Sequence, residues 1–246
     1  IYVVHVLQAD ETPVRVTKEN RTEGSKHFMW VYRTGKIYEN RPIILYDYQP
    51  SRNLSHQKKF LKDFRGICVT DGYQVYHTLE EEREDLTIAD AEPIPGTPLT
   101  NTKIPAKARR NDSLAYQIQA IYREEKKLTE ESAAKRMNHR QVIIKPMTDV
   151  AYFAWVKGNL HKVPAKGKTH KGFSYCINQE KSLHVFWEDG EVPIDNNAAE
   201  QSIRGFCIGK KLRDDDTIDE AESSAIIYGI AETAKANNLK PYNYSV

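Results

Sequence analysis

Residues 66–73 read Gly-Ile-Cys-Val-Thr-Asp-Gly-Tyr, and this stretch decides the fold. Its short apolar run predicts a buried strand, and Asp71-Gly72 predicts the turn that ends the strand. Helices are predicted on both sides of it, over 53–64 and 73–82, because apolar residues recur there at helical spacing. A buried strand between two helices is typical of an α/β sheet.

Four further strands are predicted around this one, since their sequences are rich in β-branched, aromatic and other apolar residues. They are Ile1–Ala9, Lys26–Arg33, Pro42–Tyr48 and Leu86–Ala89. The apolar pattern of the first continues to Val14 and Val16. The resulting order is three strands, a helix, a strand, a helix and a strand. This order predicts an α/β fold with a mixed five-stranded sheet flanked by helices.

The character of the sequence changes at Ala91. Four prolines and a glycine between 91 and 105 predict a loop or linker. Amphipathic helices are predicted after it, over 113–137, 149–160 and 173–187, and a last helix over 220–236. A helical block therefore separates the sheet region from the C-terminal part of the chain.

The composition is that of an ordinary globular protein. The chain has 246 residues, enough for one or two domains of about 150 residues each. Hydrophobic residues make up 39% and charged residues 28%, which excludes collagen, low-complexity disorder and a disulfide scaffold. No apolar run approaches the roughly 20 residues of a membrane helix. Three widely spaced cysteines fit a reducing cytosol, and an Ile at position 1 suggests a fragment.

Net charge gives only weak guidance to a partner, because it is +2 at pH 7. Basic residues gather over 103–110 and 162–171, and acidic residues over 80–85 and 214–222. Such runs are most often solvated faces, and the basic ones are also weak candidates for DNA contact.

Several familiar catalytic motifs are missing from the sequence. Gly167-Lys168-Thr169 resembles the end of a P-loop, but Lys162 stands where that motif needs glycine. There is no GxSxG elbow, no HExxH helix and no Cys/His set with zinc spacing. Cys176 lies on an apolar helix face and is expected in the core rather than as a nucleophile.

Three acids are candidate catalytic residues because of where they stand. Asp10 is expected to end the first strand, Asp71 ends the fourth, and Glu200 begins a helix. Acids at the ends of neighbouring strands converge at one sheet edge, and a packed helix can add a third. Three carboxylates together repel one another unless cations lie among them, and Mg²⁺ or Mn²⁺ suits such oxygen ligands. Two such ions catalyse in-line phosphoryl displacement.

Each acid also has a plain structural interpretation. Asp71-Gly72 by itself is a common turn, and Asp10 can be a loop residue after a strand. Asn197-x-x-Glu200 matches a helix capping box. The residues alone leave these alternatives open.

A set of ordered motifs resembles one protein family over nearly the whole chain. The motifs are Ala9–Val14, Met29–Tyr32, Tyr46–Arg52, Thr70–Tyr73, Ile194–Glu200, Ile203-Arg204, Ile208–Lys211, Ser224–Tyr228 and Glu232–Asn237. Together they resemble the transposases of the insertion sequence 66 family. The segments Asp-Gly-Tyr, Ile-Asp-Asn-Asn-Ala-Ala-Glu and Glu-Thr-Ala-Lys-Ala-Asn are specific in combination.

The resemblance implies a DDE-type DNA transposase with a ribonuclease-H-like core. Its catalytic and metal-binding acids correspond to Asp10, Asp71 and Glu200, which would bind Mg²⁺ or Mn²⁺, two ions in all. Residues 1–90 would form the first part of the core, 91–190 a linker and helical insertion, and 191–246 the return to the core. The expected reaction is phosphodiester cleavage at the element ends, followed by attack of the freed 3′-hydroxyl on target DNA.

Four residues are candidate DNA contacts. Arg204, at i+4 from Glu200, would hold a phosphate or pair with a neighbouring acid, with neither role preferred. Lys210 and Lys211 would bind backbone phosphate, and Asn197 would touch DNA, although capping by Asn196 and Asn197 is favoured. Trp30 and Tyr32 are expected in the core.

The resemblance implies DNA as the partner, at the element ends and the target. It also allows further copies of the chain and accessory proteins of the same element, and it implies a cytoplasmic, nucleoid-associated location without a membrane.

The sequence departs from the family pattern at several places. Leu212-Arg213 and an acidic run over 214–216 follow Lys211 where the family usually has Asn-Trp, and Gln201 replaces the usual Arg. Two alternatives therefore stand beside an active transposase. One is a catalytically inactive DNA-binding remnant, and the other is a metal-dependent nuclease of the same superfamily.

Overall fold

The computed structural model describes residues 2–16, 26–35, 38, 41–91, 114–210 and 217–244. The chain divides into two compact units. The sheet unit comprises Ile1–Ile88 and Asp195–Val246, and the helical unit comprises Ala89–Ile194. The predicted proline-rich linker and the basic run over 103–110 lie outside the described residues.

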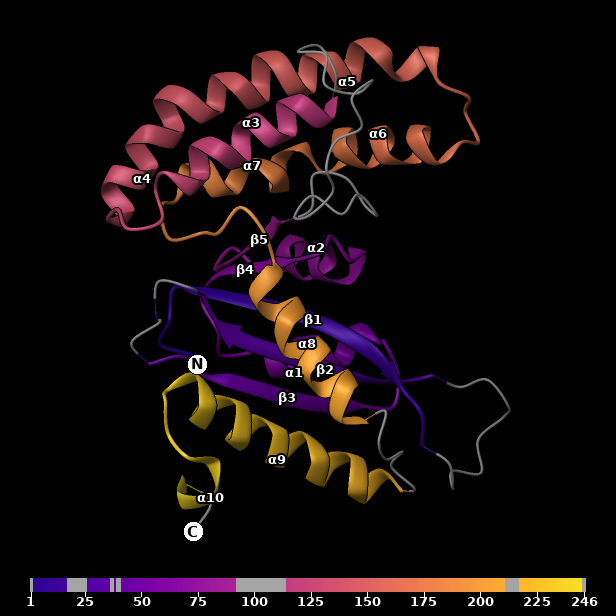
Figure 1. The fold of residues 1–246 in the computed structure, drawn as a ribbon. Helices are drawn as coiled ribbons and strands as arrows, with labels where there is room; N and C mark the ends of the chain where they lie inside the picture. Colours follow the sequence, from indigo (N-terminus) through magenta and orange to yellow (C-terminus); the bar gives the residue numbers. More distant parts are fainter. Residues whose placement is uncertain are drawn as a thin grey trace. The chain divides into compact units, whose positions relative to one another are not determined.

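The mixed five-stranded sheet is confirmed, and its strand order is β3-β2-β1-β4-β5 (Figure 1). β1 pairs antiparallel with β2 and parallel with β4, and β2 pairs antiparallel with β3. The strands are β1 (Val6–Val14), β2 (His27–Thr34), β3 (Ile44–Gln49), β4 (Gly66–Thr70) and β5 (Leu86–Asp90).

Helices cover both faces of the sheet (Figure 1). α1 (Leu54–Phe60) and α2 (Gln74–Glu81) pack on one face, and α8 (Asn197–Lys210) and α9 (Ile218–Ala236) on the other. A short helix, α10 (Pro241–Tyr244), follows α9. Because side chains alternate along a strand, β2 serves both cores. Trp30 and Tyr32 face α1 and α2 and are fully buried, which confirms their predicted place in the core.

The first strand begins later than predicted, at Val6, and it runs through Asp10 to Val14, within the continuation that its apolar pattern suggested, so Asp10 does not end it. Pairing of β1 with β4 stops at Gln8, but pairing with β2 continues through Asp10 opposite Val31 to Val14. The pairing of β1 therefore ends at Gln8 on the β4 side and at Val14 on the β2 side. Asp10 lies where the strand loses one neighbour and keeps the other.

The outer edge of the sheet is closed by side chains of α9. The hydroxyl of Thr233 accepts a hydrogen bond from Ile44 N and donates one to Ile44 O, each at 2.9 Å. Asn237 Nδ2 donates to Pro42 O at 2.8 Å and to Thr233 O at 2.7 Å. An uncovered edge strand presents unpaired backbone groups to other chains. The Glu-Thr-Ala-Lys-Ala-Asn segment therefore has a structural role at this edge.

Replacing Thr233 with Val should destabilise the sheet unit by about 1–3 kcal/mol, because Ile44 loses both hydrogen bonds at a partly buried position. Urea unfolding measures the change. Thr78→Val is the matched control, since its hydroxyl contacts only its own helix, at Gln74 O. Equal losses in the two variants would contradict the role given to Thr233.

Among its described residues, the helical unit contains five α-helices, together with π-helical and 3₁₀ segments. They are α3 (Leu114–Lys126), α4 (Ala133–His139), α5 (Ala154–Asn159), α6 (Lys168–Asn178) and α7 (Glu180–Glu188). Two π-helical segments, Arg140–Ile144 and Met147–Phe153, lie between α4 and α5, and a 3₁₀ turn, Leu160–Lys162, follows α5.

Two of the predicted helices of this unit are broken in the structure. The helix predicted over 113–137 ends at Lys126, and Ser132 caps a new one by accepting a hydrogen bond from Lys135 N. The helix predicted over 173–187 is interrupted at Gln179, which ends α6 and precedes α7. Amphipathic periodicity continues across both breaks, so it does not reveal them. The helix predicted over 149–160 is part of a longer helical run.

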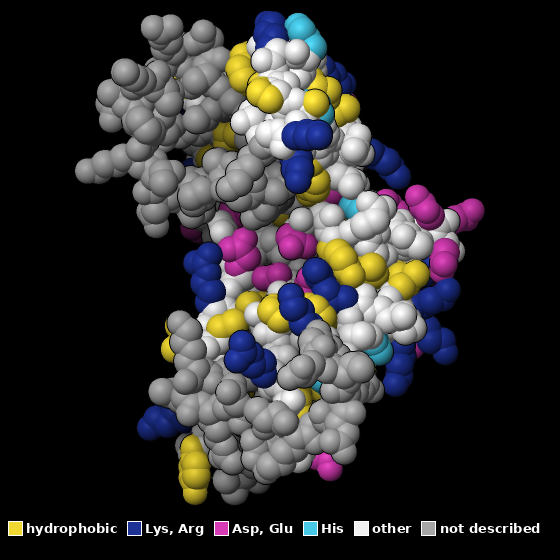
Figure 2. Space-filling model, turned by 90° about the vertical axis from the view of Figure 1, so that its right-hand side faces the viewer, with side chains coloured by type: hydrophobic (Ala, Val, Ile, Leu, Met, Phe, Trp, Pro, Cys, Tyr) yellow, Lys and Arg dark blue, Asp and Glu magenta, His cyan; other side chains and the backbone are white. Residues whose placement is uncertain are grey.

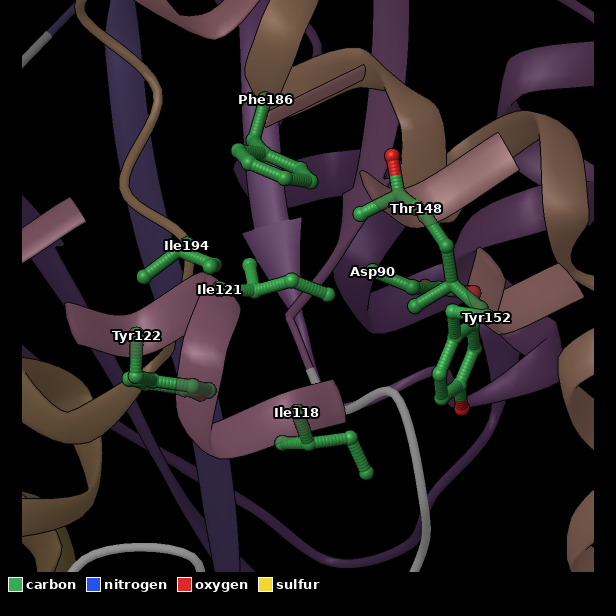
Figure 3. A pocket seen from close by; sticks show the side chains of 9 residues that line it. Asp90, Ile118, Ile121, Tyr122, Thr148, Tyr152, Phe186 and Ile194 are labelled. Atoms are coloured by element: carbon green, nitrogen blue, oxygen red, sulfur yellow. The ribbon is translucent and has the colours of Figure 1, made fainter. Parts of the chain in front are cut away.

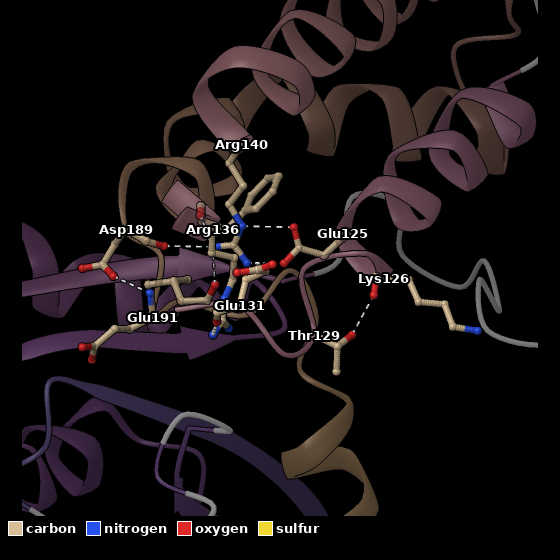
Figure 4. A network of polar contacts seen from close by, with 10 residues as sticks. Glu125, Lys126, Thr129, Glu131, Arg136, Arg140, Asp189 and Glu191 are labelled. Atoms are coloured by element: carbon tan, nitrogen blue, oxygen red, sulfur yellow. Dashed lines mark hydrogen bonds and ion pairs between the residues drawn. The ribbon is translucent and has the colours of Figure 1, made fainter. Parts of the chain in front are cut away.

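A buried arginine holds the helical unit together (Figure 4). Arg140 is fully buried, and its guanidinium forms a two-pronged ion pair with Glu125 of α3. It also donates to the carbonyl oxygens of Phe186, Asp189 and Val192. One side chain thus connects the π-helical segment to α3 and to the chain that follows α7. A buried charge persists only when it is paired in this way.

Arg140→Met should destabilise the helical unit by about 3–5 kcal/mol, because it leaves Glu125 without its buried partner. Arg123→Met, at an exposed position of α3, is the control and should change the unfolding free energy by less than about 0.5 kcal/mol. Urea unfolding measures the loss of stability. Amide hydrogen exchange shows whether this loss is located in the helical unit.

Charged side chains of both signs are interspersed on the face drawn in Figure 2, without one continuous basic patch among the residues that the structure describes. Lys162, Lys166 and Lys171 of the second basic run are exposed, as expected of a solvated face. None of the described helices is long and apolar enough to cross a membrane.

Candidate active site

Two of the three candidate acids come from neighbouring parallel strands. The register pairs Gln8 of β1 with Val69 of β4. This pairing stops two residues before Asp10, and Asp71 directly follows β4. Gly72 has a φ of 80°, so the chain turns there through a conformation that favours glycine. The Asp-Gly-Tyr motif thus ends β4, the parallel neighbour of the strand that carries Asp10.

Asp10 lies on the sheet face that α8 covers. Gln8, Asp10 and Thr12 point to the same side of β1, because side chains alternate along a strand. Gln8 Nε2 donates to Asn196 Oδ1 at 3.2 Å, and Thr12 Oγ1 lies 3.5 Å from Cys207 Sγ. Asp10 therefore lies between two points at which β1 touches α8 or its start. Glu200 lies between the same two points on the helix.

A buried asparagine fixes the start of α8 on β1. Asn196 is 2% exposed, and its Nδ2 donates to Ala9 O at 2.7 Å while its Oδ1 accepts from Gln8. Gln8 Nε2 also approaches Asp195 O, at 3.3 Å. We call these contacts of Asn196 with Gln8 and Ala9 the Asn196 clasp. It joins the residue before Asp10 to the turn that carries Glu200.

Two further contacts from the sheet hold the next turn of α8. Arg33 of β2 donates to Ala198 O at 3.0 Å, and the hydroxyl of Tyr46 in β3 donates to Ser202 O at 2.8 Å. The helix bearing Glu200 is thus attached to three strands. Its backbone position is set by the sheet rather than by its own sequence.

The predicted capping box at the start of α8 is wrong. The side chain of Asn196 contacts β1, and the backbone N–H of Asn197 is bonded instead by the carboxylate of Asp195, at 3.2 Å. Glu200 does not reach back to Asn197, because its carboxylate pairs with Arg204 at 3.1 Å. Of the two roles open to Arg204, the ion pair is the one observed.

The three acids do not form a tight cluster. Their oxygens do not all lie within 4.8 Å of one another among the described residues. Asp10 and Glu200 are half-buried, and Asp71 is exposed. Asp10 Oδ1 accepts a hydrogen bond from Glu11 N at 2.8 Å. The side chain of Glu200 is turned to Arg204.

A second set of motif residues meets on the opposite face of β1. Arg52 pairs with Glu11, which is 5% exposed, and its guanidinium stacks over the ring of Tyr73 at 3.9 Å. The hydroxyl of Tyr73 donates to Arg52 O at 3.1 Å. The neighbour of Asp10 and the residue two after Asp71 are thus tied together through one arginine. Sequence reasoning missed this link, although all three residues lie in the quoted motifs.

The other predicted DNA contacts are only partly described. Asn197 is half-buried at the first position of α8. Lys210 ends this helix, and Lys211 lies outside the described residues. Their contact with DNA stays a prediction.

The two buried cysteines, Cys68 and Cys176, are not suited to act as nucleophiles. Cys176 is fully buried beside the hydroxyl of Tyr152, at 3.1 Å, and burial raises the pKa of its thiol to about 11. Burial likewise raises the pKa of Cys68 to about 12. Both thiols are protonated at neutral pH, and the core role expected for Cys176 is confirmed.

The helical unit contains an apolar pocket, drawn in Figure 3. Its lining is mostly aliphatic and aromatic, including Ile118, Ile121, Leu183 and Phe186, with Asp90 as its one carboxylate. Such a lining is typical of a packing gap in a core, and it offers no set of convergent catalytic groups.

The sheet unit is an α/β fold with an acid within β1, one directly after its parallel neighbour β4, and one in α8, and comparison with known proteins gives this class of protein a name. The family model described as "Transposase IS66 family" matches residues 2–90 and 99–216. The chain belongs to this family of transposases.

The curated relatives that match carry no stated function. Uncharacterized protein y4qI of Sinorhizobium fredii is 25% identical over 82% of this chain and 39% of its own length. Uncharacterized protein y4jD of the same organism is 24% identical over 82% of the chain and 40% of its length. The chain thus spans about two-fifths of the length of these relatives. No solved structure matches it significantly.

Asn196→Ala should cost about 1–3 kcal/mol of stability, because Gln8 and Ala9 O lose their buried partner. The neighbouring Asn197→Ala is the matched control, since the side chain of Asn197 makes no hydrogen bond with a described residue. Thermal and urea unfolding of the two variants provide the measurement. An equal loss of stability in Asn197→Ala would contradict the prediction, because it would show that the Asn196 clasp contributes no more than an ordinary residue at a helix start.

Proposed function

We propose that this chain is the catalytic part of a metal-dependent DNA transposase, which cuts a phosphodiester at the element ends and joins the freed 3′-hydroxyl to target DNA. Asp10, Asp71 and Glu200 are its catalytic and metal-binding residues. The observation that supports the proposal most is that β1 and β4, which carry or precede Asp10 and Asp71, are parallel neighbours, and that the Asn196 clasp holds the start of the helix bearing Glu200 on β1. The family membership supports the reaction class.

The strand order supports a ribonuclease-H-like core. In the sheet unit, three antiparallel strands are followed by a parallel one, and helices lie on both faces. The helical unit interrupts this core between Ile88 and Asp195, as expected of an insertion.

The donor set fits a hard divalent cation. All three residues offer carboxylate oxygens, and their half-buried or exposed positions leave room for water and phosphate ligands. Mg²⁺ or Mn²⁺, two ions in all, would be held by Asp10 and Asp71 with Glu200 as the third ligand. When bound, these ions activate the attacking oxygen and stabilise the leaving oxygen.

The residues of the chain position the reacting groups. The Asn196 clasp keeps the backbone of Asp10 and Glu200 in register. The side chain of Arg204 is 73% exposed, so its guanidinium can leave Glu200 and bind a phosphate of the DNA. Asn197 at the start of α8, Lys210 at its end and Lys211, the next residue in the sequence, would contact the DNA backbone. The DNA partner requires no base-specific contact at these residues.

One observation favours a second candidate, the inactive DNA-binding remnant. Glu200 is paired with Arg204, and the three acids are not gathered within 4.8 Å. In an inactive protein this ion pair would be permanent, and DNA would bind without being cut.

The test is cleavage and strand transfer with Mg²⁺ or Mn²⁺, on a plasmid that carries the ends of the element encoding the chain. Asp71→Asn should lower both rates by at least about 100-fold, since it removes a group that stabilises the transition state. Asp71 is exposed, so this variant should fold as stably as the wild type. Asp63→Asn, another exposed aspartate of the sheet unit, should keep full activity.

The same assay separates the alternatives. Cleavage without joining of a 3′-end would identify a nuclease. Binding of the plasmid without any metal-dependent cleavage would identify the inactive remnant. Cleavage that survives in Asp10→Asn, Asp71→Asn and Glu200→Gln would show that the three acids are not the catalytic residues.

A further inference from the structure

A cluster of metal-ligand type lies in the helical unit, apart from the three acids of the sheet unit. Asp149, Glu180 and His184 each offer one ligand atom, and these atoms all lie within 4.8 Å of one another. Asp149 comes from the π-helical segment Met147–Phe153, and the other two from α7. We propose that this cluster binds a divalent transition-metal ion of the Zn²⁺ type, which joins the two helical segments.

The two ligands of α7 are presented on one face. Glu180 and His184 are four residues apart, so they lie one above the other on the helix. Asp149 reaches them from the neighbouring segment, where the helix is locally π-helical. Such wide turns occur frequently at functional sites, because an extra residue changes which side chains face inward.

The imidazole of His184 is aimed into the cluster. Its ring lies 4.0 Å from the ring of Trp187 and 4.7 Å, edge to face, from that of Phe153. Its Nε2 is buried and has no hydrogen-bond partner among the described residues. Asp149 Oδ1 is 3.6 Å away, too far for a hydrogen bond. A buried nitrogen that faces two carboxylates without bonding either is well satisfied by a metal ion between them.

A lysine competes for the same carboxylates. Lys157 Nζ lies 2.7 Å from Glu180 Oε2 and 2.8 Å from Oε1. Its side chain is 50% exposed, so it can move into solvent when a stronger cation arrives. With Lys157 withdrawn, Asp149 and Glu180 present two negative charges, which a divalent ion neutralises.

The donor set selects the metal. One imidazole nitrogen and two carboxylate oxygens are ligands that Zn²⁺ and Co²⁺ accept in tetrahedral sites, with water as the fourth ligand. Mg²⁺ prefers a shell made wholly of oxygen. The cluster should therefore bind Zn²⁺ and Co²⁺ in preference to Mg²⁺, in contrast to the acids of the sheet unit.

The experiment is a titration of the full chain with Co²⁺, followed by visible absorption, and with Zn²⁺, followed by calorimetry. An Asp71→Asn background weakens the proposed site of the sheet unit. One ion should bind saturably. His184→Gln should weaken binding at least tenfold, which corresponds to about 1.4 kcal/mol. Lys157→Ala should tighten it, because the competing cation is gone.

His161→Gln is the matched control, since His161 is an exposed histidine of the same unit outside the cluster. Asp149→Asn provides a second ligand variant should His184→Gln fail to fold. Binding unchanged in the ligand variants, or weakened by Lys157→Ala, would overturn the proposal. The result is independent of the proposed function, because no DNA cleavage is measured and none of the three acids is a ligand here.

Discussion

The sheet unit depends on one buried amide. The Nδ2 of Asn196 donates a hydrogen bond to Ala9 O, and these two residues are 187 positions apart in the chain. Glu200 lies on α8, the helix whose start this contact holds on β1. It sets the start of the helix, and the strands then hold the next turn through Arg33 and Tyr46. Without the clasp, the start of α8 would lose its hydrogen bonds to β1, while the hydrogen bonds of Arg33, Tyr46 and Thr233 would still join the two halves of the sheet unit.

Most of the sheet was predictable from sequence because its strands are short, apolar and separated by clear turns. The strand of residues 66–70 and the turn at Gly72 illustrate this well. Helix breaks at Gln179 and near Leu128 were not predictable, because the apolar stripe continues across each of them. The extent of β1 was not predictable either, since it depends on which neighbour each residue pairs with.

The three acids of the candidate site could be predicted from the sequence. The residues that support them could not. Asp10, Asp71 and Glu200 stand at positions that local pattern and resemblance can mark. The clasp of Asn196, the link through Arg52 and the cluster around His184 join residues that are remote in sequence, apart from the pair on α7. An Asn-Asn pair before a helix suggests a cap, and only the fold decides that Asp195 bonds the N–H of Asn197 while Asn196 faces a strand.

The division of the sheet unit has a consequence for how the protein is made. Its first part, to Ile88, leaves the ribosome before the roughly one hundred residues of the helical unit, and Asp195 follows only after them. At 5–20 residues per second, the interval is about 5–20 s. Throughout it, the face of β1 that α8 will cover and the backbone of Ile44 that Thr233 will bond are open to other molecules. The nascent chain therefore has a defined period during which an apolar sheet face and an unpaired strand edge are exposed to aggregation.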